Sequence, residues 1–214
     1  MKLSPQKVII FAPHTDDGEI GCGGTIAKYV EEGKEVYYVA FSIARTSAVQ
    51  NGFPDNILEI EVKKATAVLG IPEDNLILFD FPVRKIPEYR QDVLEEMIKL
   101  RKQIQPDIIF VPSTNDIHQD HQVIAREGLR AFKKHTILGY EEPWNNIVFE
   151  SRSFVVLEKR HIQKKIEALK CYESQRHRTY LTESAMWGIA ELRGTQLEGG
   201  YAESFEVMRW IINI

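Results

Sequence analysis

A histidine and two adjacent aspartates lie within FAPHTDDGEIGCGGT, the stretch from Phe11 to Thr25. The short apolar run VIIFA begins at Val8, so His14, Asp16 and Asp17 directly follow a predicted buried strand. Carboxylates crowded beside an apolar strand repel one another and lose hydration, and a bound cation would compensate both effects. The stretch therefore predicts a metal site at the end of this strand.

A second group of the same residue types follows another apolar run, DIIFVPS. It contains His118, Asp120 and His121. Two histidines and one carboxylate, with a position open for water, are a common ligand set for catalytic zinc. We expect His14, Asp17 and His121 to be the ligands.

The remaining residues of the two motifs predict the rest of a catalytic apparatus. Asp16 is a carboxylate free to take up a proton. His118 and Asp120 could form an imidazole–carboxylate pair, which would orient the imidazole and favour its protonated form. Each motif alone also has a structural explanation, because Asp-Asp often caps a helix and H-x-D-H can begin one. The metal prediction therefore depends on both motifs lying at the same edge of one predicted sheet.

The elements that must position these residues alternate along the chain. Apolar runs predict strands at residues 8–12, 35–42, 75–81 and 107–113, and helical spacing predicts helices at about 24–32, 57–69 and 91–105. Beyond them we expect helices at 120–133, 161–172 and 183–192, with short strands around Ile137 and Phe154. This order predicts an α/β, Rossmann-like fold with a mostly parallel sheet and helices on both faces. Its active site should lie at the carboxyl ends of the strands.

Other residues near this edge could contact a substrate. Arg45, in SIARTS after the second strand, could clamp a phosphate, a carboxylate or sugar hydroxyls, or could form an ordinary surface ion pair. Trp144, in GYEEPWNN, could stack on a sugar ring or pack within its loop. The segment YESQRHRTY contains Tyr172, His177 and Tyr180, which could line the outer part of the site.

Composition narrows the class of protein. The chain has 214 residues, of which 43% are hydrophobic and 27% charged, and no linker divides it, so we expect one domain over residues 1–214. A net charge of -4 argues against a nucleic-acid partner. No apolar run approaches the ~20 residues of a membrane span, and the N-terminus lacks a signal-peptide pattern. Cys22 and Cys171 form no C-x-x-C pair, which favours a reducing, cytoplasmic location.

The combination of PHTDDGEIGCGGT with HQDH resembles the LmbE/PIG-L family of zinc-dependent N-deacetylases. The similarity covers most of the chain and includes the region after the second strand and the C-terminal segment GGYAESFEVMR. It implies Zn²⁺, with other divalent ions also compatible, held by His14, Asp17 and His121. It also implies Asp16 as general base and His118 as a polarising group near the oxyanion. The expected partner is a small-molecule N-acetylated sugar conjugate of the N-acetylglucosamine type. Assembly into a homo-oligomer is compatible with the resemblance.

The chain departs from the family pattern at three positions. Thr15 and Gln119 stand where the family often has proline, and Gly18 displaces the glutamate that usually follows the aspartate pair. Glu19 could support the site instead, or could favour the first turn of a helix through its charge. None of these changes alters an expected ligand atom.

Two other classes of protein match parts of the pattern. GEIGCGGT is similar to the glycine turn of a nucleotide-binding Rossmann module, but adjacent carboxylates would repel a phosphate, so we expect these glycines to allow close helix packing. His14-x-Asp16 with a distant histidine also matches the facial triad of non-haem iron oxygenases. That triad usually lies on an all-β jelly roll, whereas this chain alternates strands and helices.

Overall fold

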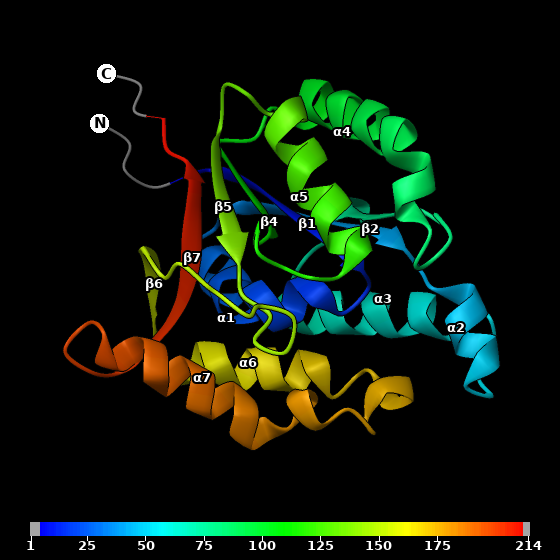
Figure 1. Cartoon of the computed structure of the whole chain (residues 1–214). Helices are drawn as coiled ribbons and strands as arrows, with labels where there is room; N and C mark the ends of the chain where they lie inside the picture. The colour runs from blue at the N-terminus through cyan, green and yellow to red at the C-terminus, as the bar shows by residue number, and fades with distance from the viewer. Residues whose placement is uncertain (1–4, 212–214) are drawn as a thin grey trace.

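One twisted sheet organises the molecule, whose structure is a computed structural model that describes residues 5–211. Within those residues the sheet has seven strands in the order β3-β2-β1-β4-β5-β7-β6 (Figure 1). The strands are β1 (Lys7–His14), β2 (Glu35–Ser42), β3 (Leu76–Leu78), β4 (Ile108–Pro112), β5 (Thr136–Tyr140), β6 (Ser153–Leu157) and β7 (Tyr201–Arg209). Strands β1 to β5 run parallel, and β7 runs antiparallel to both β5 and β6. Residues 1–4, part of the stretch used to predict the absence of a signal peptide, lie outside the described residues.

The central strand β1 is buried on both of its faces. Its register places Phe11 opposite Val39 of β2, and Ile9 opposite Ile109 of β4. Ile10 belongs to the apolar core on one side of the sheet, and Phe11 belongs to the core on the other side. This two-sided burial explains why the strand reads as a continuous apolar run instead of an alternating one.

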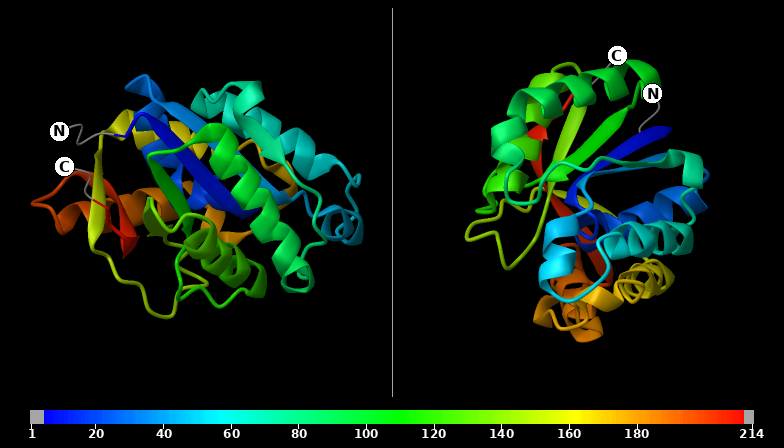
Figure 2. Two further views of the ribbon diagram at one scale, coloured as in Figure 1. Left: turned by 90° about the horizontal axis from the view of Figure 1, so that it is seen from above. Right: turned by 90° about the vertical axis from the view of Figure 1, so that its right-hand side faces the viewer.

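Helices cover both faces of the sheet, as the right-hand view of Figure 2 shows. They are α1 (Asp17–Glu31), α2 (Arg45–Gln50), α3 (Ile57–Leu69), α4 (Arg90–Ile104), α5 (Gln119–Ala131), α6 (Lys159–Leu169) and α7 (Glu183–Thr195). Helices α4 and α5 lie on one face, α1, α3 and α6 lie on the other, and α7 packs beside α6 (Figure 1). The predicted α/β architecture is confirmed. Among the described helices, none combines the length and apolar character that a bilayer crossing requires.

Helix α1 begins at Asp17, well before the predicted start near Gly24. The prediction was wrong because the glycines in this stretch lower the intrinsic helix propensity. A Cβ atom at Gly21 would come within 2.3 Å of the Tyr140 ring, so glycine is what allows the helix to lie this close to the sheet. The expected role of the glycines in close packing is confirmed, and the aspartate pair lies at the first turn of α1.

The last strand, β7, was not predicted, although it lies inside the sheet between β5 and β6. Its Glu203 is buried at 5% exposure and accepts a hydrogen bond from Lys165 Nζ at 2.7 Å. The same carboxylate accepts hydrogen bonds from the backbone N–H groups of Gly24 (2.9 Å) and Thr25 (2.7 Å) in α1. The C-terminal strand is therefore tied to the helix that begins at the aspartate pair.

Candidate functional site

A cavity of about 330 Å³ opens at the carboxyl ends of the parallel strands. Its lining includes residues at or after the ends of five strands: His14 for β1, Ala44 for β2, Val83 for β3, His118 for β4 and Glu142 for β5. Ligands of open α/β sheets bind at this edge. The two polar motifs of the sequence therefore meet in one cavity.

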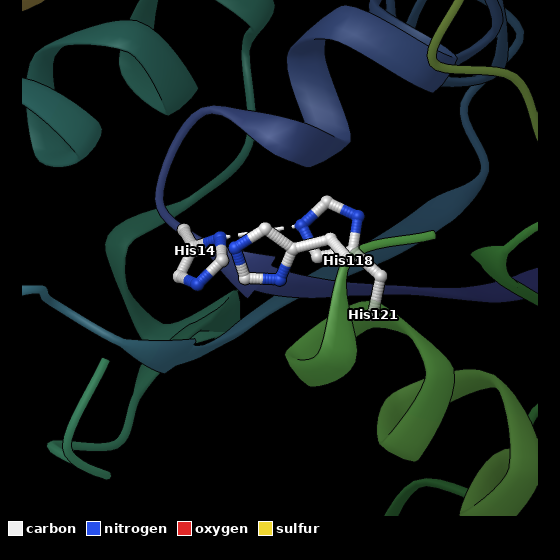
Figure 3. A group of neighbouring side chains, drawn as sticks. All are labelled: His14, His118 and His121. Carbon is white, nitrogen blue, oxygen red and sulfur yellow. Dashed lines mark hydrogen bonds between the residues drawn. The ribbon is translucent and has the colours of Figure 1, made fainter. Parts of the chain in front are cut away.

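Three of the cavity's side chains bring their donor atoms to one point. His14 Nδ1 lies 3.1 Å from Asp17 Oδ2 and 3.3 Å from His121 Nε2. Asp17 Oδ2 lies 3.2 Å from His121 Nε2. Ligand atoms at the ~2.1 Å bond lengths of a tetrahedral zinc ion are themselves about 3.4 Å apart, so the spacing suits such an ion. Figure 3 shows His14 at the end of β1, directed toward His121 on α5.

Two further carboxylates fix the tautomers of these histidines. Asp120 Oδ2 lies 3.0 Å from His14 Nε2, and Asp116 Oδ2 lies 2.8 Å from His121 Nδ1. Each imidazole therefore donates its N–H to a carboxylate and turns the lone pair of its other nitrogen toward Asp17. This is the usual arrangement around metal-binding histidines.

The electrostatic environment of the three donors favours a positive charge. Burial lowers the pKa of His14, but the Asp17 charge and the hydrogen bond to Asp120 outweigh burial and raise the pKa to about 9. Burial also opposes ionisation of His121, yet the charges of Asp17 and Glu142 hold its pKa well above the usual value. Burial would raise the pKa of Asp17, but the two imidazoles hold it well below its usual value. Protons on the imidazoles or a bound divalent cation would compensate the negative charge of the neighbouring carboxylates.

Asp16 lies beside this group but has different surroundings. It precedes the first residue of α1, makes no capping hydrogen bond with its side chain, and lines the cavity. Burial and the Asp17 charge raise its pKa to about 6. Asp17 instead accepts a hydrogen bond from the His14 backbone N–H at 2.8 Å as well as contacting both imidazoles. The two adjacent carboxylates therefore occupy distinct positions.

The expected imidazole–carboxylate pair of His118 and Asp120 is wrong. His118 Nδ1 accepts a hydrogen bond from the backbone N–H of Asp120 at 3.2 Å, while the Asp120 carboxylate turns to His14. Burial and the charges of His121 and His14 lower the pKa of His118 to about 4. His118 is therefore neutral, with its proton on Nε2, because Nδ1 acts as the acceptor.

Two other donor sets come close enough to share an ion. One is His14, His118 and His121, and the other is Asp17, His121 and Glu142; the donors within each set lie within 4.8 Å of one another. The triangle of His14, Asp17 and His121 is tighter and matches tetrahedral spacing better. All three sets include His121.

Arg45 lies outside the cavity, unlike the position expected for a substrate clamp. Its guanidinium contacts Asp80 at 2.8 Å, and Asp55 and Glu59 at 3.7 Å each. The second expectation from the sequence, an ordinary surface ion pair, describes this arrangement. Nothing in the sequence indicated that these three acidic residues would lie next to Arg45, which follows the second strand.

Several cavity residues were missed by sequence analysis. Arg84 and Arg178 both line the cavity, and so does Glu142, which is 1% exposed and whose Oε1 lacks a hydrogen-bond partner among the described residues. Arg84 follows β3 and Glu142 follows β5, so their position just after a parallel strand was the available signal. Arg178 follows no strand, but it lies within YESQRHRTY, the segment in which other residues were expected to line the outer part of the site.

The aromatic residues near the site divide into two groups. Trp144 and Tyr180 both line the cavity and stack with ring centroids 3.7 Å apart. Tyr172 is buried, and its hydroxyl lies 2.6 Å from the Thr15 carbonyl oxygen and 2.9 Å from Glu19 Oε1. The Glu19 carboxyl thus supports the backbone beneath the cavity, and burial raises its pKa to about 8 against the hydrogen bonds from tyrosine. His177 is exposed and does not line the cavity.

Known proteins are similar to this chain in sequence or in fold. Diacetylchitobiose deacetylase of Thermococcus kodakarensis is 29% identical over 133 residues, which cover 59% of this chain and 49% of that protein. The alignment thus spans about half the length of that relative. N,N'-diacetylchitobiose deacetylase from Pyrococcus horikoshii superposes with a TM-score of 0.80 at 22% identity, covering 96% of this chain and 84% of the other.

The fold also occurs in an enzyme with a different reaction. GalB, the 4-carboxy-2-hydroxymuconate hydratase from Pseudomonas putida KT2440, superposes with a TM-score of 0.80 at 18% identity, covering 98% of each chain. The shared fold alone therefore does not decide the chemistry. The model of the PIG-L family, described as GlcNAc-PI de-N-acetylase, matches residues 9–132. This match includes both polar motifs and more than half of the chain, and the chain therefore belongs to the PIG-L family.

Proposed function

We propose that the protein is a zinc-dependent hydrolase that removes the acetyl group from an N-acetylated amino sugar, giving acetate and a free amine. The observation that carries this proposal is the triangle of His14 Nδ1, Asp17 Oδ2 and His121 Nε2, 3.1–3.3 Å on each side, with Asp16 beside it in the cavity. The family and the deacetylases similar to this chain support the same reaction. The whole chain would act as one deacetylase domain.

The donor set fits a divalent ion, since two neutral imidazoles and one carboxylate suit zinc. When bound, such an ion would polarise the acetamide carbonyl and lower the pKa of a bound water toward ~7. His14, Asp17 and His121 would hold it. Asp120 and Asp116 would keep the two imidazoles in the tautomers that this role needs.

The residues around this position would divide the remaining work. Asp16 would take the proton of the attacking water and later deliver it to the nitrogen as the C–N bond breaks. His118 would donate a hydrogen bond from Nε2 to the acetamide oxygen as negative charge develops there. No covalent intermediate with the protein is required. The stacked rings of Trp144 and Tyr180 would supply an apolar wall for the sugar.

The cellular setting is part of the proposal. Cys22 is buried and Cys171 is half-buried, and both are free thiols, as a reducing cytoplasm favours. The substrate would be a small molecule, with no nucleic acid as partner.

Metal content and acetate release test this function directly. We expect purified protein to carry about one tightly held divalent ion per chain, most readily zinc. Stripping the ion with a chelator should abolish acetate release from a panel of N-acetylated sugars, and adding Zn²⁺ should restore it. Full activity in a strong chelator, in protein without metal by elemental analysis, would refute the proposal. Activity that disappears under nitrogen would instead favour the oxygenase.

Arg45 should have little influence on this reaction. Because its guanidinium is held by Asp80, Asp55 and Glu59, we expect Arg45→Ala to leave KM unchanged for charged and neutral substrates alike. Steady-state kinetics on one substrate of each kind is the measurement. A rise in KM confined to the charged substrate would show that Arg45 reaches the substrate after all.

A further inference from the structure

Two arginines at the cavity are held by neutral partners. Arg84 Nη2 donates to Gln50 Oε1 at 3.0 Å, and Arg178 Nε donates to Gln175 Oε1 at 3.2 Å. In the part of the chain that the structure describes, neither guanidinium forms an ion pair with a carboxylate. We propose that Arg84 and Arg178 bind an anionic group of the substrate, a phosphate or a carboxylate. This inference rests on the proposed function and specifies its substrate class.

The choice of glutamine over a carboxylate has an electrostatic consequence. An amide oxygen fixes the direction of a guanidinium without cancelling its charge, whereas a carboxylate does both. Arg45, by contrast, contacts three carboxylates. Unlike Arg45, the two cavity arginines are therefore oriented without a carboxylate against the guanidinium, and a guanidinium pairs well with phosphate and carboxylate oxygens.

The backbone at Arg84 is held in an unusual conformation. Its φ is +66°, in the left-handed region that non-glycine residues rarely adopt. The Arg84 N–H donates to Asp120 Oδ2 at 2.6 Å, and the Ile86 N–H donates to Asp120 Oδ1 at 3.2 Å. The same Asp120 carboxylate orients His14. Strain of this kind persists where neighbours enforce it, and here it presents an arginine to the cavity.

Arg178 is positioned by a different set of contacts. Its guanidinium carbon lies 5.9 Å from the centre of the Tyr180 ring, which stacks on Trp144. The segment that carries it is anchored by Glu61, which accepts hydrogen bonds from the Ser174 N–H at 2.9 Å and the Ser174 hydroxyl at 2.6 Å. The arginine thus projects from a fixed segment beside the aromatic pair.

The charge of the two guanidinium groups favours an anion as well. The carboxylates that line the cavity, with those of Asp116 and Asp120 that hold the histidines, offset the charge of a bound divalent ion. The attraction for an anionic group is therefore local to Arg84 and Arg178.

Substitution of the two arginines tests the assignment. The zinc-loaded enzyme would be assayed with N-acetylglucosamine, with its 1-phosphate and with its 1-O-carboxymethyl glycoside. We expect Arg84→Gln and Arg178→Gln each to raise KM for the anionic substrates roughly 10- to 100-fold, the usual loss for a charged hydrogen bond, and to spare the neutral sugar. Arg176→Gln is the matched control, because Arg176 pairs with Glu173 outside the cavity. Comparing the two anionic substrates identifies phosphate or carboxylate as the preferred group.

Charge cancellation separates binding from a structural role. Gln50→Glu and Gln175→Glu keep each arginine and its orientation but neutralise its charge, so they should raise KM for anionic substrates as arginine removal does. If the arginines only support the fold, these two variants should behave as wild type. An unchanged preference between anionic and neutral substrates in all four variants would overturn the proposal.

A binding measurement distinguishes this inference from the proposed function. Glucose 1-phosphate has no acetamide group, and its titration into the zinc-loaded protein followed by calorimetry needs no turnover. Binding that weakens at least about 10-fold in both arginine variants supports the anion site even if no N-acetyl sugar is hydrolysed. Binding that is absent, or equal in wild type and variants, refutes the anion site even if deacetylation is observed.

Discussion

Asp16→Asn is expected to keep its metal ion and its fold while losing about 10²- to 10⁴-fold in kcat, the usual contribution of a positioned general base. The Asp16 side chain lines the cavity without a capping hydrogen bond, so the amide should cause little structural change. Only the ionised carboxylate can accept a proton, and burial with the Asp17 charge raises its pKa to about 6. Wild-type kcat should therefore fall as pH decreases through that pKa, and a bound cation moves the midpoint lower. The acidic limb should be absent from the variant.

Asp17→Asn should give the opposite pattern. Asp17 Oδ2 lies within 3.2 Å of both His14 Nδ1 and His121 Nε2, and a neutral amide is a poorer ligand for a divalent cation. Metal affinity should fall by more than the ~10- to 100-fold typical of changing a residue that merely supports a ligand. Elemental analysis and kcat of both variants, measured in parallel, decide the matter. If Asp16→Asn loses the ion or turns over normally, the proposed mechanism is wrong.

His121→Ala should lose most of the metal, whereas His118→Ala should keep the ion and turn over about 10²- to 10³-fold more slowly. His121 offers Nε2 to the triangle, with Asp116 holding its other nitrogen at 2.8 Å. His118 instead accepts the Asp120 backbone N–H and keeps its Nε2 proton for the substrate. Metal content per chain and kcat are the two measurements.

A control variant, a folding check and the outcome that would contradict the ligand assignment complete this experiment. His177→Ala, at an exposed position outside the cavity, should change neither quantity. Thermal melts of the His121 variant in excess Zn²⁺ show whether it still folds, since 2% exposure makes this side chain part of the packing. If both His118→Ala and His121→Ala lose the ion while Asp17→Asn retains it, the three histidines are the true ligand set.

The fold could be predicted where one physical pattern dominates a segment. Helix α3 occupies Ile57–Leu69, as the helical spacing predicts, and Gly70 ends it with a φ of +86°. Strand β2 also has the predicted bounds. Strand β7 was missed because buried Glu203 interrupts its apolar face, and contacts with Lys165 and with the backbone of α1 explain a charge there. Local patterns reveal burial, and they do not reveal which distant residue neutralises a buried charge.

The same distinction applies to the site. The sequence identifies His14, Asp16 and Asp17 as candidates because they are close in the chain and follow a recognisable strand. It gives no direction for the Asp120 side chain, which contacts His14 across 106 positions instead of the nearby His118. The cavity arginines were missed for a related reason, since the sequence does not show which loop residues face the cavity.

Because β7 lies between β5 and β6, it restricts when the protein can fold during synthesis and where the chain can be truncated. Every proposed metal ligand is translated by residue 121, yet Lys165, only 5% exposed, needs Glu203 as its partner. Without that partner an unpaired buried ammonium would cost about 3–5 kcal/mol, and β5 and β6 would each lose a neighbouring strand. On the ribosome, the sheet cannot be completed until almost the whole chain has emerged. A fragment limited to residues 9–132 would contain the chemical groups without the strand that completes their scaffold.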